Sequence, residues 1–71
     1  MKAMYLLNLL KKYNIPCVSM YTKKEIHFLY NNIIWVITYK DKFYNISSQK
    51  EEKEKLSYLE LKEYLINILE V

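Results

Sequence analysis

The first apolar positions of the chain recur at helical spacing. Met4, Leu7 and Leu10 follow one another in steps of three residues, which places their side chains on one side of an α-helix. Asn14 can adopt the left-handed conformation that ends a helix, and the proline two residues later prevents the helix from continuing. The pattern therefore predicts a helix over residues 2–14.

After this helix the pattern changes to β-branched and aromatic residues separated by short polar breaks. Breaks of this length allow only antiparallel hairpins, because a parallel crossover needs about a dozen residues. Asn31-Asn32 is the strongest turn, since asparagine tolerates the positive φ that a two-residue hairpin loop requires. The predicted strands cover residues 17–22, 26–30, 33–39 and 43–46.

The last third of the chain reads as a second helix. Ser48 and Glu51 have the spacing of a capping box, in which the hydroxyl and the carboxylate each bind a free backbone N–H. Glu51 and Lys55 form a favourable pair four residues apart. We therefore predict a helix over residues 49–70. The whole chain, residues 1–71, is then one α+β domain with an N-terminal helix, a three- to four-stranded antiparallel meander and a C-terminal helix.

The Asn31-Asn32 turn also predicts which side chains share a face of the sheet. It pairs Phe28 with Trp35 and Tyr30 with Ile33, so aromatic residues gather on one face, to which we also assign Phe43. The other face is predicted to be aliphatic and to hold Val18, Met20, Leu29, Ile34, Val36 and Ile46.

Neither of the two predicted faces is polar, whereas an antiparallel sheet with one wet face alternates apolar and polar residues. Either the helices cover opposite faces, or both cover one face and the other meets a partner. A two-fold homodimer is the commonest form of such a contact. The apolar side of the second helix is also wider than the stripe of about 100° that a surface helix needs.

We therefore expect a protein interface formed by the aromatic face and the second helix. A small domain that wraps its last helix deeply is the alternative explanation of the same surplus. The candidate interface residues are Tyr21, Phe28, Tyr30, Trp35, Tyr39, Tyr64 and Ile68.

Composition excludes several classes of function. The chain of 71 residues contains no glycine, so it cannot form the glycine-rich loops that cradle phosphates. One cysteine and one histidine cannot supply a four-ligand zinc site or an internal disulfide. We expect no metal and no cofactor. Lys, Ile, Tyr, Asn and Phe, which have A/T-rich codons, make up 35 of the 71 residues, which suggests an AT-rich genome such as that of a virus, phage or plasmid.

The hydropathy pattern gives no membrane segment. The longest apolar run covers residues 33–37, far shorter than the roughly 20 residues of a membrane span. The N-terminal apolar stretch lacks the length and the cleavage site of a signal peptide. We expect a cytoplasmic protein, in the host cell if the gene is viral, that does not contact membranes.

Candidate catalytic residues are few. His27 falls on the aliphatic face near Glu25, with no serine beside it, and Cys17 falls on the opposite face. No nucleophile–base pair results, because such a pair needs the two side chains within hydrogen-bonding distance. We therefore expect a protein without enzymatic activity.

The order of elements, with Glu25 at the second strand and Lys40 at the end of the third, resembles the opening of the PD-(D/E)xK nucleases, which include the archaeal Holliday-junction resolvases. That resemblance implies a metal-dependent nuclease fold. The position of the family's second acid holds Thr38, and the metal needs that carboxylate to be held beside the scissile phosphate. An active nuclease is therefore not expected.

Charge distribution supports an alternative function. Residues 1–24 contain five lysines and no acid, whereas residues 51–71 contain three lysines and six glutamates. A meander brings its first and third turns to the same end of the sheet, where lysines near aromatic side chains could bind nucleic acid. The candidate residues are Lys23, Lys24, Lys40 and Lys42. Against this, arginine is absent and the net charge is only +3.

The sequence thus favours a small, non-enzymatic protein-interaction module that forms a homodimer. Its size and codon bias fit an inhibitor or regulator from a virus, phage or plasmid, which would bind a host protein such as a nucleic-acid-handling defence enzyme. The alternative is a small nucleic-acid-binding protein that uses the lysine-rich end of the sheet and its aromatic face.

Overall fold

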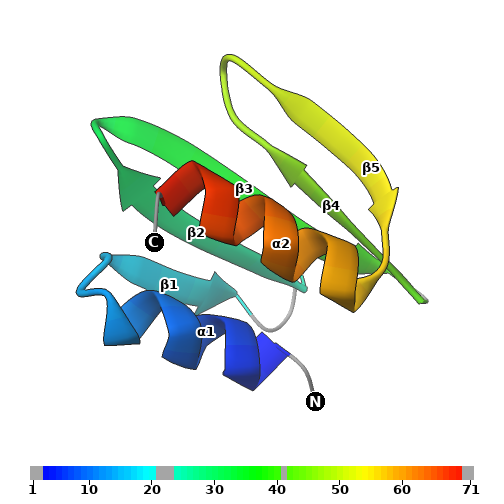
Figure 1. Ribbon diagram of the computed structural model, residues 1–71, viewed down its shortest axis with the longest axis horizontal. Coiled ribbons are helices and arrows are strands. Elements are labelled where there is room, and N and C mark those ends of the chain that lie inside the picture. The colour runs from blue at the N-terminus through cyan, green and yellow to red at the C-terminus, as the bar shows by residue number, and fades with distance from the viewer. Residues whose placement is uncertain (1–2, 21–23, 41, 70–71) are drawn as a thin grey trace.

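A computed structural model describes residues 3–20, 24–40 and 42–69 of the chain. The strands form one antiparallel sheet in the order β1-β2-β3-β4-β5 (Figure 1). The α+β class, with a helix at each end of a meander, is confirmed, but the sheet has five strands. The elements are α1 (Ala3–Lys12), β1 (Cys17–Met20), β2 (Glu25–Tyr30), β3 (Ile33–Lys40), β4 (Phe43–Ser47), β5 (Glu52–Leu56) and α2 (Tyr58–Leu69).

Helix α1 ends as its sequence predicts. Asn14 has a φ of 58°, the left-handed conformation that the side chain of asparagine tolerates. The N–H of Ile15 donates to the carbonyl of Leu10 at 3.0 Å, and the N–H of Asn14 donates to that of Lys11 at 3.0 Å. These two bonds form a Schellman motif, which satisfies carbonyls that the helix itself leaves free. The chain then turns back directly into β1.

The hairpin of β2 and β3 has the predicted register. Tyr30 lies opposite Ile33 and Phe28 opposite Trp35. Asn31 and Asn32 have φ values of 53° and 62°, as a two-residue hairpin loop of the favoured twist requires. In β1 the pairing is Cys17 with Phe28. The turn chemistry therefore determined correctly which side chains share a face.

The predicted helix over residues 49–70 is wrong in its first part, because residues 52–56 form β5. Ser48 lies in the hairpin loop between β4 and β5, where its Oγ accepts bonds from the N–H groups of Lys50 and Glu51. The N–H of Ser48 donates to the carbonyl of Glu51 at 2.8 Å. The N–H of Lys55, whose φ is 56°, donates to Asn45 Oδ1 at 2.8 Å. Side-chain acceptors thus hold both the loop and the irregular pairing near Asn45.

Helix α2 begins after Ser57, at a second copy of the same capping pattern. The N–H of Glu60 donates to Ser57 Oγ at 3.1 Å, and the N–H of Ser57 donates to Glu60 Oε1 at 2.9 Å. The backbone and side-chain bonds to Ser57 lower the pKa of Glu60 below its ordinary value of 4.5, because they favour the charged carboxylate. This reciprocal pair sets where α2 begins.

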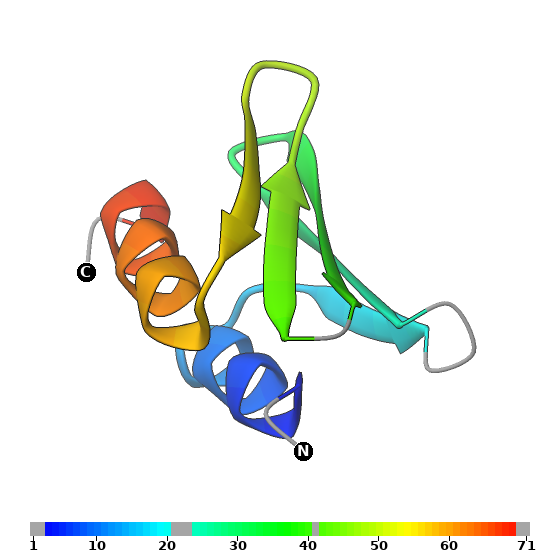
Figure 2. The same ribbon diagram turned by 90° about the vertical axis from the view of Figure 1, so that its right-hand side faces the viewer.

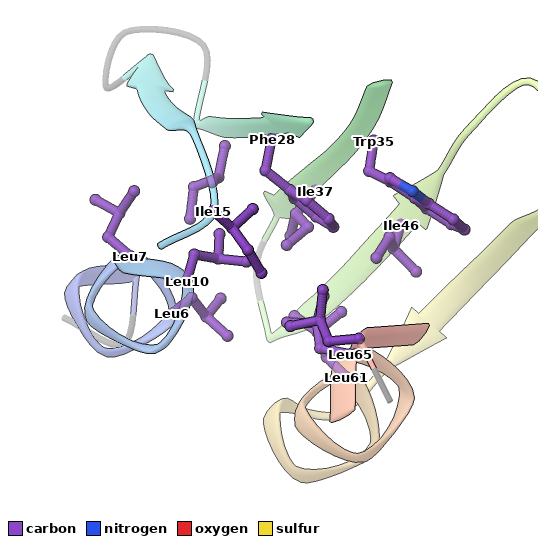
Figure 3. Packing of buried hydrophobic residues seen from close by; sticks show 12 residues of the cluster. Leu6, Leu7, Leu10, Ile15, Phe28, Trp35, Ile37, Ile46, Leu61 and Leu65 are labelled. Carbon is purple, nitrogen blue, oxygen red and sulfur yellow. The ribbon is translucent and has the colours of Figure 1, made fainter. Parts of the chain in front are cut away.

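Both helices cover the same face of the sheet (Figure 2). Leucines of α1 and α2 pack there against isoleucines of the strands, as Figure 3 shows. The rings of Phe28 and Trp35 stack in this layer, with centroids 6.1 Å apart and planes at 6°. Ile46 lies opposite Ile37 and is buried in the same layer. Its assignment to the aliphatic face was wrong, because the register of β4 turns it toward the helices.

Within the described part of the chain, neither helix has the length and apolar character that a bilayer crossing demands.

Candidate functional site

The sheet face opposite the two helices carries exposed aliphatic side chains. Val18, Leu29 and Ile34 are 52%, 42% and 63% exposed, and they come from the three neighbouring strands β1, β2 and β3. Met20 and Val36 are half-buried on the same face. We call these five residues the open patch. They are the aliphatic face that the hairpin register predicts, without Ile46.

Beyond the open patch this face is mainly polar, so the prediction that neither face is polar is wrong here. The register places Val36 beside Ser47 and Thr38 beside Asn45, so β4 contributes polar side chains across from β3. Phe43 lies opposite Lys40 and is 51% exposed. Its assignment to the aromatic face was wrong, because alternation from the buried Ile46 turns Phe43 the other way. The aliphatic surface therefore lies on β1, β2 and β3, and the exposed ring of Phe43 is the apolar contribution of β4 to this face.

A shallow hollow of about 360 Å³ lies within the open patch. Its lining includes Val18, Leu29 and Ile34, together with His27 and Pro16. On the same face, His27 Nε2 lies 2.9 Å from Glu25 Oε1. The hollow is thus an apolar depression with one polar pair beside it, a surface that can receive an apolar side chain.

The structure places the predicted interface residues mainly in or around the core. Phe28 and Trp35 are 2% and 4% exposed beneath the helices. Tyr30, Tyr39, Tyr64 and Ile68 are half-buried and pack against the same cluster. Tyr21 lies outside the described residues.

Two of the half-buried tyrosines bind within the chain through their hydroxyl groups. The hydroxyl of Tyr30 donates to the carbonyl of Leu69 at 3.2 Å. That of Tyr64 donates to Glu51 Oε1 at 3.1 Å. Burial, and then the Glu51 carboxylate, raise the pKa of Tyr64 above its ordinary value of 10.0. These aromatic residues join α2 to the hairpins, whereas the side chains of Val18, Leu29 and Ile34 in the open patch stay exposed.

The predicted lysine cluster is brought together at one end of the sheet. Lys24, Lys40 and Lys42 are exposed, and we call these three the lysine end. The carbonyl of Lys24 accepts a bond from the N–H of Tyr39 at 3.1 Å, which joins the turn before β2 to the end of β3. Phe43 adds an exposed aromatic ring at this end. Lys23 lies outside the described residues.

The candidate nucleophile and base of the sequence do not meet in the structure. Cys17 packs partly against the core on the helix-covered face, whereas His27 lies on the open face. Glu25 lies opposite Thr38, so the position that would hold a second acid in a PD-(D/E)xK nuclease is a neighbouring hydroxyl. Within residues 3–20, 24–40 and 42–69, no group of three potential metal ligands is found.

Comparison of the chain with family models, with curated proteins and with solved structures gives no match.

The aromatic face, predicted to form the interface, is the face that the helices cover, and polar residues in the sequence indicate the open face instead. The face rich in aromatic residues has the larger apolar area. Two small helices cover it in preference to the aliphatic face, because the hydrophobic free-energy gain scales with the apolar area that is buried. The polar residues at Thr38, Asn45 and Ser47 mark the other face as the one in contact with water. They were the available clue to which face the helices leave uncovered.

Proposed function

We propose that this chain is a small, non-enzymatic protein-interaction module that binds its partner through the open patch. The observation that carries the proposal is that Val18, Leu29 and Ile34 are all at least 42% exposed on adjacent strands of the face without helices. The largest apolar patch of a monomer is about 300–600 Å² and often functional. A partner that covered this patch would remove apolar surface from water without any change in the fold.

The proposal includes self-association, because an isologous contact uses the same patch of each copy. Residue types with A/T-rich codons make up 35 of the 71 residues, which supports an origin in a virus, phage or plasmid. In that setting the module acts in the cytoplasm of the host as an inhibitor or regulator. It occludes a surface of a host protein, for example a defence enzyme that handles nucleic acid.

The test compares two variants of equally exposed aliphatic residues. Ile34 in the open patch is 63% exposed and Leu59 on α2 is 64% exposed, so Ile34→Lys and Leu59→Lys introduce the same charge at similar accessibility. We expect the Leu59 variant to keep the oligomeric state and the bound partners of the wild type, and the Ile34 variant to lose them. Light scattering after size exclusion measures the first, and affinity capture from cells that express the chain measures the second.

Circular dichroism of both variants provides the folding control. Equal partner binding by the wild type and both lysine variants would contradict the assignment of the open patch. A wild type that is monomeric at every concentration would remove self-association from the proposal.

The lysine end supports a second candidate function, nucleic-acid binding. Phe43 is 51% exposed and pairs with Lys40, while Lys24 and Lys42 lie exposed at the same end of the sheet. An exposed ring beside several lysines can stack a base while the ammonium groups bind phosphates. This arrangement is the specific observation that keeps the alternative open.

Charge reversal and salt separate this candidate from protein binding. Replacement of Lys24, Lys40 and Lys42 by Glu should abolish binding of a fluorescent single-stranded oligonucleotide, whereas the matched triple replacement at Lys53, Lys55 and Lys62 should have a much smaller effect. Binding by the wild type should fall steeply between about 50 and 200 mM salt, because released counterions drive it. Fluorescence anisotropy measures both. Equal loss in both triple variants would show nonspecific attraction to lysines, and no binding at low salt would refute this candidate.

A further inference from the structure

Among the strands that the structure describes, β1 forms one edge of the sheet and pairs with β2 alone. The N–H of Leu29 donates to the carbonyl of Pro16 at 3.0 Å, and in the same register Val18 lies opposite His27. Hydrogen-bonded and non-hydrogen-bonded pairs alternate along an antiparallel ladder. The backbone groups of Val18 therefore point toward β2, whereas those of Cys17 and Ser19 point away from the sheet.

The two edges of the sheet differ in their protection against additional strands. The edge strand β5 carries the alternating charges of Glu52, Lys53, Glu54 and Lys55, all of them exposed. Charged side chains on an edge are a common protection against pairing with another chain. Strand β1 has the sequence Cys-Val-Ser-Met and carries no charge. The β5 edge is thus protected by charged side chains, whereas the β1 edge has none and is called the unguarded edge.

The hollow of the open patch adjoins the unguarded edge. Pro16, Cys17 and Val18 line it from β1 and the residue before β1, and Leu29 and Ile34 line it from the next two strands. In strand addition, main-chain hydrogen bonds to an edge supply affinity and pockets for alternate side chains supply specificity. An added strand beside β1 could place an apolar side chain in this hollow.

Lysines lie at both ends of β1. Lys11 and Lys12 are exposed at the end of α1, just before β1, and Lys24 is exposed after it. Residues 1–24 contain no acid. A second copy of β1 paired antiparallel would place Lys24 of one copy near Lys11 and Lys12 of the other, and like charges repel. The flanks of this edge therefore favour an acidic occupant over a second copy.

We propose that the β1 edge binds an extended partner segment that has an apolar centre and acidic residues at both ends. The segment pairs with the outward backbone groups of Cys17 and Ser19 and fills the hollow with an apolar side chain. Its acids pair with Lys11 and Lys12 at one end and with Lys24 at the other. The inference rests on the proposed function, because it names the kind of partner that the open patch receives.

The test uses a fluorescein-labelled peptide of two glutamates, the run Val-Thr-Val-Thr-Val and two further glutamates. Proline at an edge position whose N–H faces outward removes one donor and leaves the sheet ladder intact. We expect Ser19→Pro to weaken peptide binding about five- to tenfold, which is the effect of roughly one hydrogen bond. The control Ser19→Ala keeps the N–H, so its peptide affinity should stay within about twofold of the wild type. Fluorescence anisotropy measures the affinities, and circular dichroism checks the fold.

Two peptide controls leave the protein unchanged. Backbone N-methylation of the central Thr-Val-Thr should abolish binding, because it removes the N–H groups that face β1 in either strand direction. Replacement of the four glutamates by lysines should weaken binding at least about tenfold. Failure of the glutamate peptide to bind the wild type, or equal binding of the glutamate and lysine peptides, would overturn the acidic segment. Unchanged binding by a folded Ser19→Pro variant would overturn strand addition. A wild-type dimer that Ser19→Pro dissociates would show a second copy on this edge and refute the inference.

The cellular partner separates this inference from the proposed function. If Ile34→Lys loses the partner and Ser19→Pro keeps it, the open patch stands and strand addition fails. If both variants keep the partner, the proposed function itself fails.

Discussion

The two faces of the sheet are both rich in apolar residues near β2 and β3, but they differ in size of side chain and in what covers them. On the covered face the stacked rings of Phe28 and Trp35 lie beneath two helices. On the open face Leu29 and Ile34, their neighbours along the same strands, are 42% and 63% exposed. Apolar content alone therefore does not tell which face is the core.

Two features determine which face the helices cover: the apolar area of its side chains and the polar residues on β4. Aromatic side chains bury about 150–250 Å² each, so covering that face gives the larger hydrophobic gain. The open face becomes polar at Asn45 and Ser47 on β4, where water can satisfy the side chains. A domain with only two short helices can cover one face, and the aliphatic side chains of the other face stay exposed to solvent.

The largest predicted effect compares two isoleucines of β3 that point to opposite faces. Ile37 is 0% exposed and Ile34 is 63% exposed. We expect Ile37→Ala to lower the free energy of unfolding by about 2–5 kcal/mol, because it leaves a cavity in the core. At protein concentrations low enough to keep the chain monomeric, Ile34→Ala should change that free energy by no more than about 0.5 kcal/mol. Urea denaturation followed by Trp35 fluorescence measures both.

Ile37→Val provides a milder form of the same test. It should cost about 0.5–1.5 kcal/mol and stay measurable if Ile37→Ala does not fold. Equal destabilisation by Ile34→Ala and Ile37→Ala would mean that the open face is covered in solution, for example by a second copy. In that case the loss at Ile34 should depend on protein concentration.

Much of the fold could be predicted because local chemistry sets it. The helix stop at Asn14 and the turn at Asn31-Asn32 both use left-handed asparagines, and each leaves little choice for the next element. From the turn, the pairing of Phe28 with Trp35 follows by counting. The β1 strand keeps the predicted faces, although it pairs Cys17 with Phe28 across a wider loop.

The second helix was misplaced because the capping pattern occurs twice. Ser48 and Glu51 have the same spacing as Ser57 and Glu60, yet the first pair lies in a hairpin loop and the second caps α2. Both patterns satisfy local N–H groups, so the motif alone cannot distinguish them. The residues after each pair distinguish a loop from a cap. The alternating charges of residues 52–55 suit an edge strand beside β4, and the helical apolar period begins only after Ser57.

The candidate site could be predicted in part. Counting from the turn correctly placed Val18, Leu29 and Ile34 together on one face. Which face the helices would cover depends on contacts between residues far apart in the chain, and no local pattern contains them. The lysine end was predicted from meander topology alone, because the first and third turns of a meander lie at the same end of the sheet.

A further prediction concerns the N-terminal cap of α2, one of the two helices that cover the core face of the sheet. Ser57→Ala removes the cap of α2 and should cost about 1 kcal/mol of stability. The matched Ser48→Ala, in the β4–β5 loop, should cost less, because Ser48 Oγ accepts its bonds at an exposed hairpin where water can replace it. Neither variant should alter binding at the open patch. Urea denaturation measures the two losses. A larger loss for Ser48→Ala would contradict the assignment of Ser57 as the cap.

The smallest expected effect is a pH dependence of the same cap. The bonds to Ser57 lower the folded-state pKa of Glu60 below 4.5, so the unfolded state binds the proton more tightly. The stabilisation is fully present above the unfolded value and is lost as pH falls through the lowered folded value. We therefore expect Glu60→Gln to lose less stability than the wild type between about pH 5 and pH 3. Glu63→Gln, which removes an exposed carboxylate of α2 outside the cap, should behave as the wild type. Thermal unfolding across this pH range measures the difference in stability. If the stability of the wild type and of Glu60→Gln falls in parallel as the pH is lowered, the Glu60 carboxylate does not hold the cap of α2, the helix that lies over the covered face.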